Sequence, residues 1–212
     1  MKLDEFIKKY SNLPVIDTEN LLAGKSAPSP IRVQISRWVR SGKLIQIKRG
    51  IYLLAKEYRK MDVYEPYLAS ILEKPSYISL EKALEYHGLI PEGVPVYTLV
   101  TTKRPCRLVS SVGTFDYRHI KSSLFWGYSS ISVKVQTAFM ASAEKALLDL
   151  FYLRGMNVSF EYLDGMRLQN IEKINIDTLE KYAIRFDKPG MTRAAGVVKK
   201  YISAQTEENE LL

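Results

Sequence analysis

The residues whose types best suit chemistry are basic and small polar side chains that recur between positions 29 and 49. Arginine can form two hydrogen bonds to guanine, serine can reach a base edge or a phosphate, and an exposed valine can contact the methyl group of thymine. The candidates for such contacts are Ser29, Arg32, Val33, Ser36, Arg37, Arg40, Lys43, Lys48 and Arg49. Their chemistry favours recognition of nucleic acid.

A second basic cluster surrounds Cys106, the single cysteine of the chain. Lys103, Arg104 and Arg107 either form a solvated loop or supply an auxiliary phosphate contact. Neighbouring positive charge can lower the pKa of a thiol, but an ordinary, partly buried thiol is the simpler interpretation. A single cysteine excludes an internal disulfide and a metal site built from several cysteines.

The acidic and imidazole side chains do not form a catalytic pattern. Glu144 and Asp149 lie five residues apart in an expected helix and project about 140° from each other, which makes them a poor carboxylate pair. His87 and His119 are distant from each other and lack a nearby nucleophile. The sequence has no glycine-rich phosphate loop, no Gly-x-Ser-x-Gly elbow and no spacing typical of metal ligands. We therefore expect no enzyme, no cofactor and no metal.

Positive charge is concentrated at the start of the chain. The 212 residues carry 31 Lys and Arg against 23 Asp and Glu, a formal net charge of +8. Residues 1–60 hold 13 basic and 5 acidic side chains, whereas residues 61–212 hold 18 of each. A polyanion would therefore meet one strongly positive region, for which nucleic acid is the first interpretation and an anionic membrane surface the second.

Two short helices are expected before the basic stretch. Apolar residues at spacings of three and four predict the first from Leu3 to Tyr10. Asp17 or Thr18 can cap a second, which would bury Leu21 and Leu22.

A third helix is expected to present the candidate base contacts. The Ser-Pro pair at positions 29 and 30 is a typical helix start and Gly42 a typical stop, which places the helix over residues 30–41. At about 100° per residue, its two sides differ in character. The apolar side comprises Ile31, Ile35, Trp38 and Val39, and the opposite stripe comprises Val33, Ser36, Arg37 and Arg40. We expect the first side to enter the core and the second to remain free for a ligand.

A β-hairpin with a basic turn should follow this helix. Two β-rich runs, residues 44–47 and 51–54, flank Lys48, Arg49 and Gly50. At such a tip, we expect Lys48 and Arg49 to have no partner but phosphate. Short helices followed by a basic hairpin are the order of a winged helix-turn-helix, in which the third helix enters the major groove. The alternative is an amphipathic surface helix with no nucleic-acid ligand.

The rest of the chain is expected to form an α+β domain with a mainly antiparallel sheet. Apolar spacing predicts a short linker helix within residues 61–75, and a strand entering a helix at residues 76–84. Further strands are predicted at residues 94–102, 107–112, 114–120 and 130–136, and helices at residues 143–154, 176–186 and 191–201. The predicted organisation is a winged helix over residues 1–60, the linker over 61–75, the α+β domain over 76–205 and a loose acidic tail over 206–212.

Several blocks of this sequence resemble one known family in order and spacing. The run from Ile35 to Leu54 resembles the recognition helix and wing of AbiEi-type antitoxins, the transcriptional regulators of type IV toxin-antitoxin and abortive-infection operons. Later blocks that look like those of the family are Tyr77–Pro91, Thr101–Arg104, Gly113–Arg118, Leu124–Gly127 and Ala143–Leu150. The resemblance covers roughly residues 1–155 and fades beyond.

The resemblance implies a repressor that binds double-stranded DNA in its own promoter and counteracts a nucleotidyltransferase-like toxin encoded alongside. The DNA-binding role carries over to Ser36, Arg37, Arg40, Lys43, Lys48 and Arg49. The toxin-neutralising role carries over to no particular residue. Two alternatives stay open: a solitary winged-helix regulator without a toxin, and a protein-interaction module whose basic head contacts an acidic partner.

The sequence also bears on location. Its longest apolar runs fall far below the roughly 18 residues of a membrane span. The first ten residues carry Asp4, Glu5 and three lysines, which is not the pattern of a secretory signal. We expect a cytoplasmic protein with no membrane partner.

Overall fold

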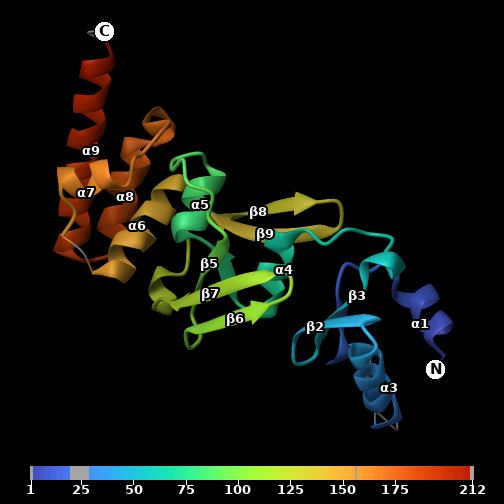
Figure 1. Ribbon diagram of the computed structural model, residues 1–212. Helices are drawn as coiled ribbons and strands as arrows, with labels where there is room; N and C mark the ends of the chain where they lie inside the picture. The colour runs from blue at the N-terminus through green and yellow to red at the C-terminus, as the bar shows by residue number, and fades with distance from the viewer. Residues whose placement is uncertain (1, 20–28, 156, 211–212) are drawn as a thin grey trace.

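A computed structural model describes residues 2–19, 29–155 and 157–210 (Figure 1). The chain has a mixed α+β fold: a small N-terminal unit, a central sheet and a group of C-terminal helices, with the two termini at opposite ends of the molecule. Within the described ranges, no helix combines the length and apolar character needed to cross a bilayer.

In the described part of the N-terminal unit, helices pack with a small antiparallel sheet. The elements of this part are α1 Leu3–Tyr10, β1 Ile16–Asp17, α3 Ser29–Arg40, β2 Leu44–Lys48, β3 Ile51–Leu54 and the single 3-10 turn η1 Lys56–Tyr58. The strands lie in the order β1-β3-β2. The expected first helix, third helix and hairpin are thereby confirmed. The second helix expected through Leu21 and Leu22 lies outside the described residues.

An aromatic cluster holds this unit together. Phe6 of α1 and Trp38 of α3 are both buried, and their ring centroids lie 4.7 Å apart. Ile35 lies one turn before Trp38 on the same side of α3 and is 3% exposed. The apolar side expected for this helix therefore does enter a core.

Gly42 ends α3 as its sequence position predicts. Its φ of +72° lies in the left-handed region that glycine tolerates without strain. The Gly42 N–H donates to the Val39 carbonyl at 3.0 Å, and the Lys43 N–H donates to the Trp38 carbonyl at 2.9 Å. This pair of bonds is a Schellman motif, which turns the chain directly into β2.

The larger unit is a six-stranded mixed sheet with helices on both faces. Its strands are β4 Ser76–Ile78, β5 Val96–Thr101, β6 Cys106–Ser110, β7 Gly113–His119, β8 Tyr128–Val133 and β9 Gln136–Ala141, in the order β6-β7-β5-β4-β9-β8. Its helices are α4 Glu65–Leu72, α5 Leu80–Tyr86, α6 Ala143–Arg154, α7 Phe160–Gly165, α8 Ile176–Arg185 and α9 Pro189–Glu210, with 3-10 turns η2 Ser122–Leu124 and η3 Ile171–Lys173.

The pairing of the sheet agrees with expectation in the main, and one expected strand needs correction. Three of the five ladders of the sheet are antiparallel, as expected for a mainly antiparallel sheet, but the pairs β4/β9 and β5/β7 are parallel, so the sheet is mixed. The run at residues 130–136, expected as one strand, instead ends β8, turns through Lys134 at a φ of +54° and begins β9. Strand β9 is therefore an element that the sequence pattern does not predict.

Three helical segments also differ from expectation. The segment expected to link two domains forms α4, whose Leu68, Ala69 and Leu72 are buried in the core of the larger unit. Helix α7 is not among the helices that apolar spacing predicts. The expected loose acidic tail continues α9 as far as Glu210.

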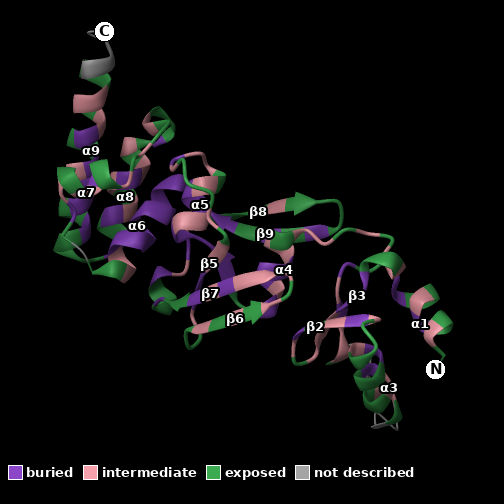
Figure 2. Cartoon of the chain, viewed as in Figure 1, coloured by how far each residue is buried: buried purple, intermediate pink, exposed green. Residues whose placement is uncertain are grey.

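Opposite faces of the sheet pack against different helices. The Tyr117 hydroxyl donates to the Ala69 carbonyl of α4 at 2.6 Å. Paired residues of neighbouring strands share a face of the sheet, and Tyr77 shares its face with Val100 and Arg118. Because successive residues of a strand point to opposite faces, Tyr77 lies on the face opposite to Tyr117. The Tyr77 hydroxyl donates to Asp149 of α6 at 2.9 Å. Figure 2 shows many buried residues in α6, whereas β8 and β6 at the two edges of the sheet are exposed or half-buried.

The N-terminal hairpin also packs against the larger unit. Ile47 of β2 and Leu53 of β3 are buried in the same core as α4 and the six-stranded sheet. Ile35 and Trp38 belong instead to the core of the N-terminal unit. The hairpin is therefore shared between two cores, which fixes its position relative to the sheet.

Candidate nucleic-acid interface

The solvent-facing side of α3 carries the stripe expected from the sequence. Val33 is 51% exposed, and Ser36, Arg37 and Arg40 are also exposed (Figure 2). Val33 does not belong to the buried core of this unit. The stripe is therefore open to a ligand along about two turns of helix.

The arginines of α3 and of the hairpin turn are free of protein partners. Within residues 2–19, 29–155 and 157–210, no hydrogen bond or ion pair engages the side chain of Arg32, Arg37, Arg40 or Arg49, and all four are exposed. Lys43, half-buried after the helix, likewise has no such partner in that part of the chain. Ser29 begins α3, but its side chain lies outside the described part of the structure.

The hairpin turn lies beside α3. Arg32 of α3 and Arg49 of the turn line one cavity of about 540 Å³, together with Ile35 and Tyr52. The Thr18 hydroxyl and the Thr18 N–H both bond the Gly50 carbonyl, at 3.1 Å and 2.8 Å, which anchors the turn. The structure thus brings Arg32 of the helix and Arg49 of the turn to one side of the unit.

Lys48 is not free at the hairpin tip, and the expectation that phosphate is its sole partner is wrong. Its ammonium lies 2.8 Å from the Leu72 carbonyl and 2.7 Å from the Glu73 carboxylate. A β-bulge between Gln46 and Lys48 shifts the register of β2 against β3, and bulges characteristically re-aim side chains. Lys48 therefore joins the hairpin to the larger unit.

Glu73 also binds Lys103, the first residue of the second basic cluster. The Lys103 ammonium lies 3.0 Å from the other carboxylate oxygen of Glu73. Burial raises the pKa of Glu73, but the hydrogen bonds and charges of Lys48 and Lys103 outweigh burial and lower it below its ordinary value. Arg104 and Arg107 are exposed, on the turn before β6 and on β6 itself. This cluster belongs to the larger unit and not to the surface of α3.

The thiol and the imidazoles have structural surroundings. Burial raises the pKa of Cys106, and the Glu73 carboxylate adds to this effect, so the nearby lysines do not activate the thiol. A ring nitrogen of His87 lies 2.8 Å from the Ala141 carbonyl, and one of His119 lies 2.9 Å from the Lys103 carbonyl. The described residues contain no group of three or more His, Cys, Asp or Glu arranged to hold a metal.

Sequence reasoning missed a buried polar network under α6. Lys145 and Asp149, one helical turn apart, form an ion pair with no exposed side-chain surface. The Tyr77 hydroxyl accepts from Lys145 at 2.9 Å and donates to Asp149, which also accepts from the Ser79 hydroxyl at 2.8 Å. Burial lowers the pKa of Lys145 and raises that of Asp149. The only sequence signal was the i,i+4 spacing of the two charges in an apolar helix.

The surroundings of this network are closed and aromatic. The Lys145 ammonium lies 4.8 Å from the ring centroid of Trp126 and 4.9 Å from that of Phe186. Glu144 is also engaged, since its carboxylate accepts from the Asn175 N–H at 2.9 Å. These groups tie α6 to the sheet and to α8, and none of them faces α3.

Comparison of the sequence with models of protein families gave no match, and comparison with curated proteins gave none either. The geometry of the surface around α3 therefore carries the functional argument.

Proposed function

We propose that this protein is a DNA-binding transcriptional regulator whose N-terminal unit acts as a winged helix. In this proposal α3 is the recognition helix and the β2–β3 hairpin is the wing. The observation that carries it is the exposed stripe of α3, where Arg37 and Arg40 have no partner within the described residues. A buried, paired or acidic outer side of α3 would have argued against it.

The side chains divide by the contact that each would make. Val33, Ser36, Arg37 and Arg40 line the centre of the exposed stripe and would contact base edges in the major groove. Arg32 and Arg49, which line one cavity, and Lys43, which follows α3, would contact phosphates. Lys48, which is paired with Glu73, would instead hold the wing against the larger unit, and Lys103 is paired with the same carboxylate.

The resemblance to AbiEi-type antitoxins extends the proposal to the larger unit. By that likeness the protein would repress its own operon by occluding the promoter, and it would counteract a nucleotidyltransferase-like toxin. A reading frame of that class beside the gene supports the antitoxin role. Its absence favours a solitary regulator, which leaves the DNA-binding proposal unchanged.

A gel-shift comparison of the gene's own upstream region with random duplex tests the proposal. Arg37→Ala should reduce binding to the upstream region roughly tenfold and binding to random DNA much less, because a bidentate arginine contributes about 1–3 kcal/mol of base discrimination. Arg49→Ala should weaken both about equally. The matched control is Arg193→Ala, which removes the same charge from an exposed position on α9.

Two results would refute parts of this scheme. Equal losses on both DNAs for Arg37→Ala would exclude base recognition by that residue. No salt-sensitive binding to the upstream region by the unsubstituted protein would overturn the repressor proposal and favour a protein-interaction module with a basic head.

A further inference from the structure

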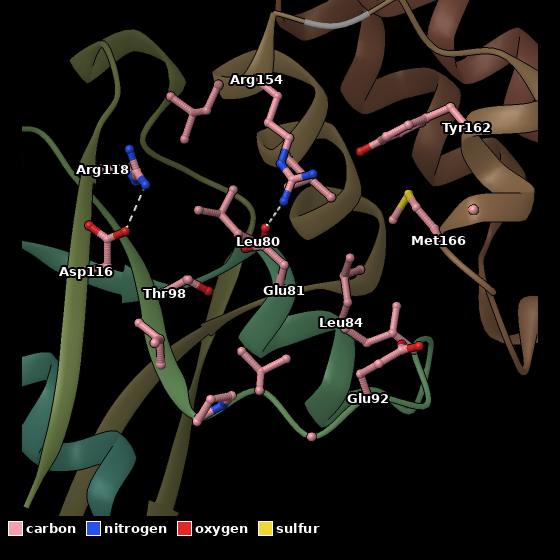
Figure 3. A pocket seen from close by; sticks show the side chains of 18 of the residues that line it. Leu80, Glu81, Leu84, Glu92, Thr98, Asp116, Arg118, Arg154, Tyr162 and Met166 are labelled. Atoms are coloured by element: carbon pink, nitrogen blue, oxygen red, sulfur yellow. Dashed lines mark hydrogen bonds and ion pairs between the residues drawn. The ribbon is translucent and has the colours of Figure 1, made fainter.

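A further hollow lies far along the chain from α3. It has a volume of about 810 Å³ and lies between β5, β6 and β7 on one side and α5, α6 and α7 on the other (Figure 3). The volume falls within the range of small-molecule sites.

The interior of this cavity is mainly apolar. Its apolar lining includes Leu80, Leu84, Val96, Leu150, Leu153 and Met166. Figure 3 shows Leu84 of α5 and Met166, just after α7, on facing sides of the hollow. Because these side chains come from separate elements, the cavity is a feature of the tertiary fold and suits the apolar body of a ligand.

One side of the cavity has a surplus positive charge. Thr98, Asp116 and Arg107 lie in one row across β5, β7 and β6, and Asp116 is already 2.9 Å from Arg118. Of the other acidic groups of the lining, Glu81 is paired with Arg154 and Glu92 with Arg167. Glu161, on the α7 side, has a neutral partner, the Ser159 hydroxyl. Among the described residues, Arg107 is left without a hydrogen-bond or ion-pair partner. An anionic group would complement it.

The opposite wall has an unsatisfied hydroxyl. The Tyr162 oxygen is buried and has no hydrogen-bond partner in the described part of the chain. Figure 3 shows the Tyr162 hydroxyl directed toward the hollow from the side of α7. Because a buried hydroxyl without a partner is unfavourable, an oxygen of a bound molecule would stabilise it.

We propose that this cavity binds a small organic acid with an apolar body. The carboxylate would lie at the sheet side with Arg107 and Arg118, the body against Leu84 and Met166, and a second oxygen within reach of Tyr162. Three features of the cavity carry this assignment independently: its apolar lining, its surplus guanidinium and its unpartnered hydroxyl.

Calorimetric titration of the full chain with octanoate, 8-hydroxyoctanoate and 1-octanol tests the proposal without DNA. Octanoate should bind more tightly than 1-octanol, and 8-hydroxyoctanoate more tightly still. Arg107→Gln should weaken both acids roughly threefold, as expected for an exposed charge pair. The matched control is Arg104→Gln, which removes the same charge three residues earlier, outside the lining of the cavity. It should change the affinity for neither octanoate nor 8-hydroxyoctanoate.

Tyr162→Phe tests the inner end of the site. This change should leave the affinity for octanoate unaltered. It should remove the higher affinity for 8-hydroxyoctanoate, which one hydrogen bond makes roughly threefold to tenfold greater than that for octanoate. Met166→Trp, which fills the cavity from a partly exposed position, should abolish binding of both acids. The absence of saturable binding by either acid would overturn the proposal. So would equal affinity for 1-octanol and octanoate, or equal effects of Arg107→Gln and Arg104→Gln.

Discussion

Replacement of Asp149 by asparagine should destabilise the larger unit strongly. Asp149 is the counterion of Lys145 and the acceptor for the hydroxyls of Tyr77 and Ser79, and neither charged side chain of the pair has exposed surface. Asparagine retains an acceptor for the hydroxyls but leaves the ammonium without a counterion among aromatic rings.

The magnitude follows from the burial of the remaining charge. Removing one member of a buried ion pair costs about 3–5 kcal/mol, because the other charge stays desolvated and uncompensated. For a chain of this size, that loss corresponds to a decrease in Tm of roughly 10 °C. Urea unfolding followed by circular dichroism measures the free energy of unfolding directly.

Two further variants make the test specific. Asp164→Asn, the same change at an exposed position of α7, should alter the free energy of unfolding by less than about 0.5 kcal/mol. Lys145→Met combined with Asp149→Asn should recover part of the loss, because no buried charge then remains. If the free energy of unfolding of Asp149→Asn is within about 0.5 kcal/mol of that of the unsubstituted protein, Lys145 and Asp149 do not form a buried pair of charges.

Three other predictions concern the N-terminal unit and its attachment. The pKa of Glu73 is lowered in the folded protein from its ordinary value of 4.5. Its ion pairs therefore stabilise the fold fully at a pH above 4.5, and this stabilisation is lost as the pH falls through the lower pKa of the folded state. The free energy of unfolding, measured in urea at about pH 7 and about pH 3, should show this loss. The loss should be smaller in Glu73→Gln, and an equal loss in that variant would contradict the prediction. Gly42→Ala should destabilise the protein by about 1 kcal/mol, because alanine is strained at the positive φ of this position, and the Tm should fall. An unchanged Tm would refute the role of the Schellman motif. Trp38→Ala should lower the free energy of unfolding by about 3–5 kcal/mol. It should speed amide hydrogen exchange in α1 and α3 but not in α6, because these helices belong to two different cores. A uniform increase in exchange across the chain would show that the two cores are not separate.

Local patterns predict α3 and its two sides well. The helical period depends on neighbouring residues alone, so the burial of Trp38 and the exposure of Arg37 follow from spacing. Gly42 is likewise a local signal, confirmed by its positive φ. The candidate base contacts therefore lie on the side of the helix that their spacing predicts.

Features that depend on distant residues are not predictable in this way. The parallel pairing of Ile78 with Met140 joins segments far apart in the sequence, and no local pattern specifies it. The partner of Lys48 depends on a bulge in β2 and on the position of Glu73, and neither is visible from spacing. The burial of Lys145 depends on aromatic rings from other elements.

The most direct test of the central claim is the salt dependence of binding to the gene's own upstream DNA. Fluorescence anisotropy titrations at several salt concentrations should give a Kd that rises steeply with salt, with a log–log slope of about 0.9 per phosphate contact. Arg49→Ala should lower that slope by about one contact, whereas Lys48→Ala should change it little because Glu73 and Leu72 already bind that ammonium. A Kd independent of salt, or no binding, would contradict the assignment of α3 and the hairpin as a DNA-binding surface.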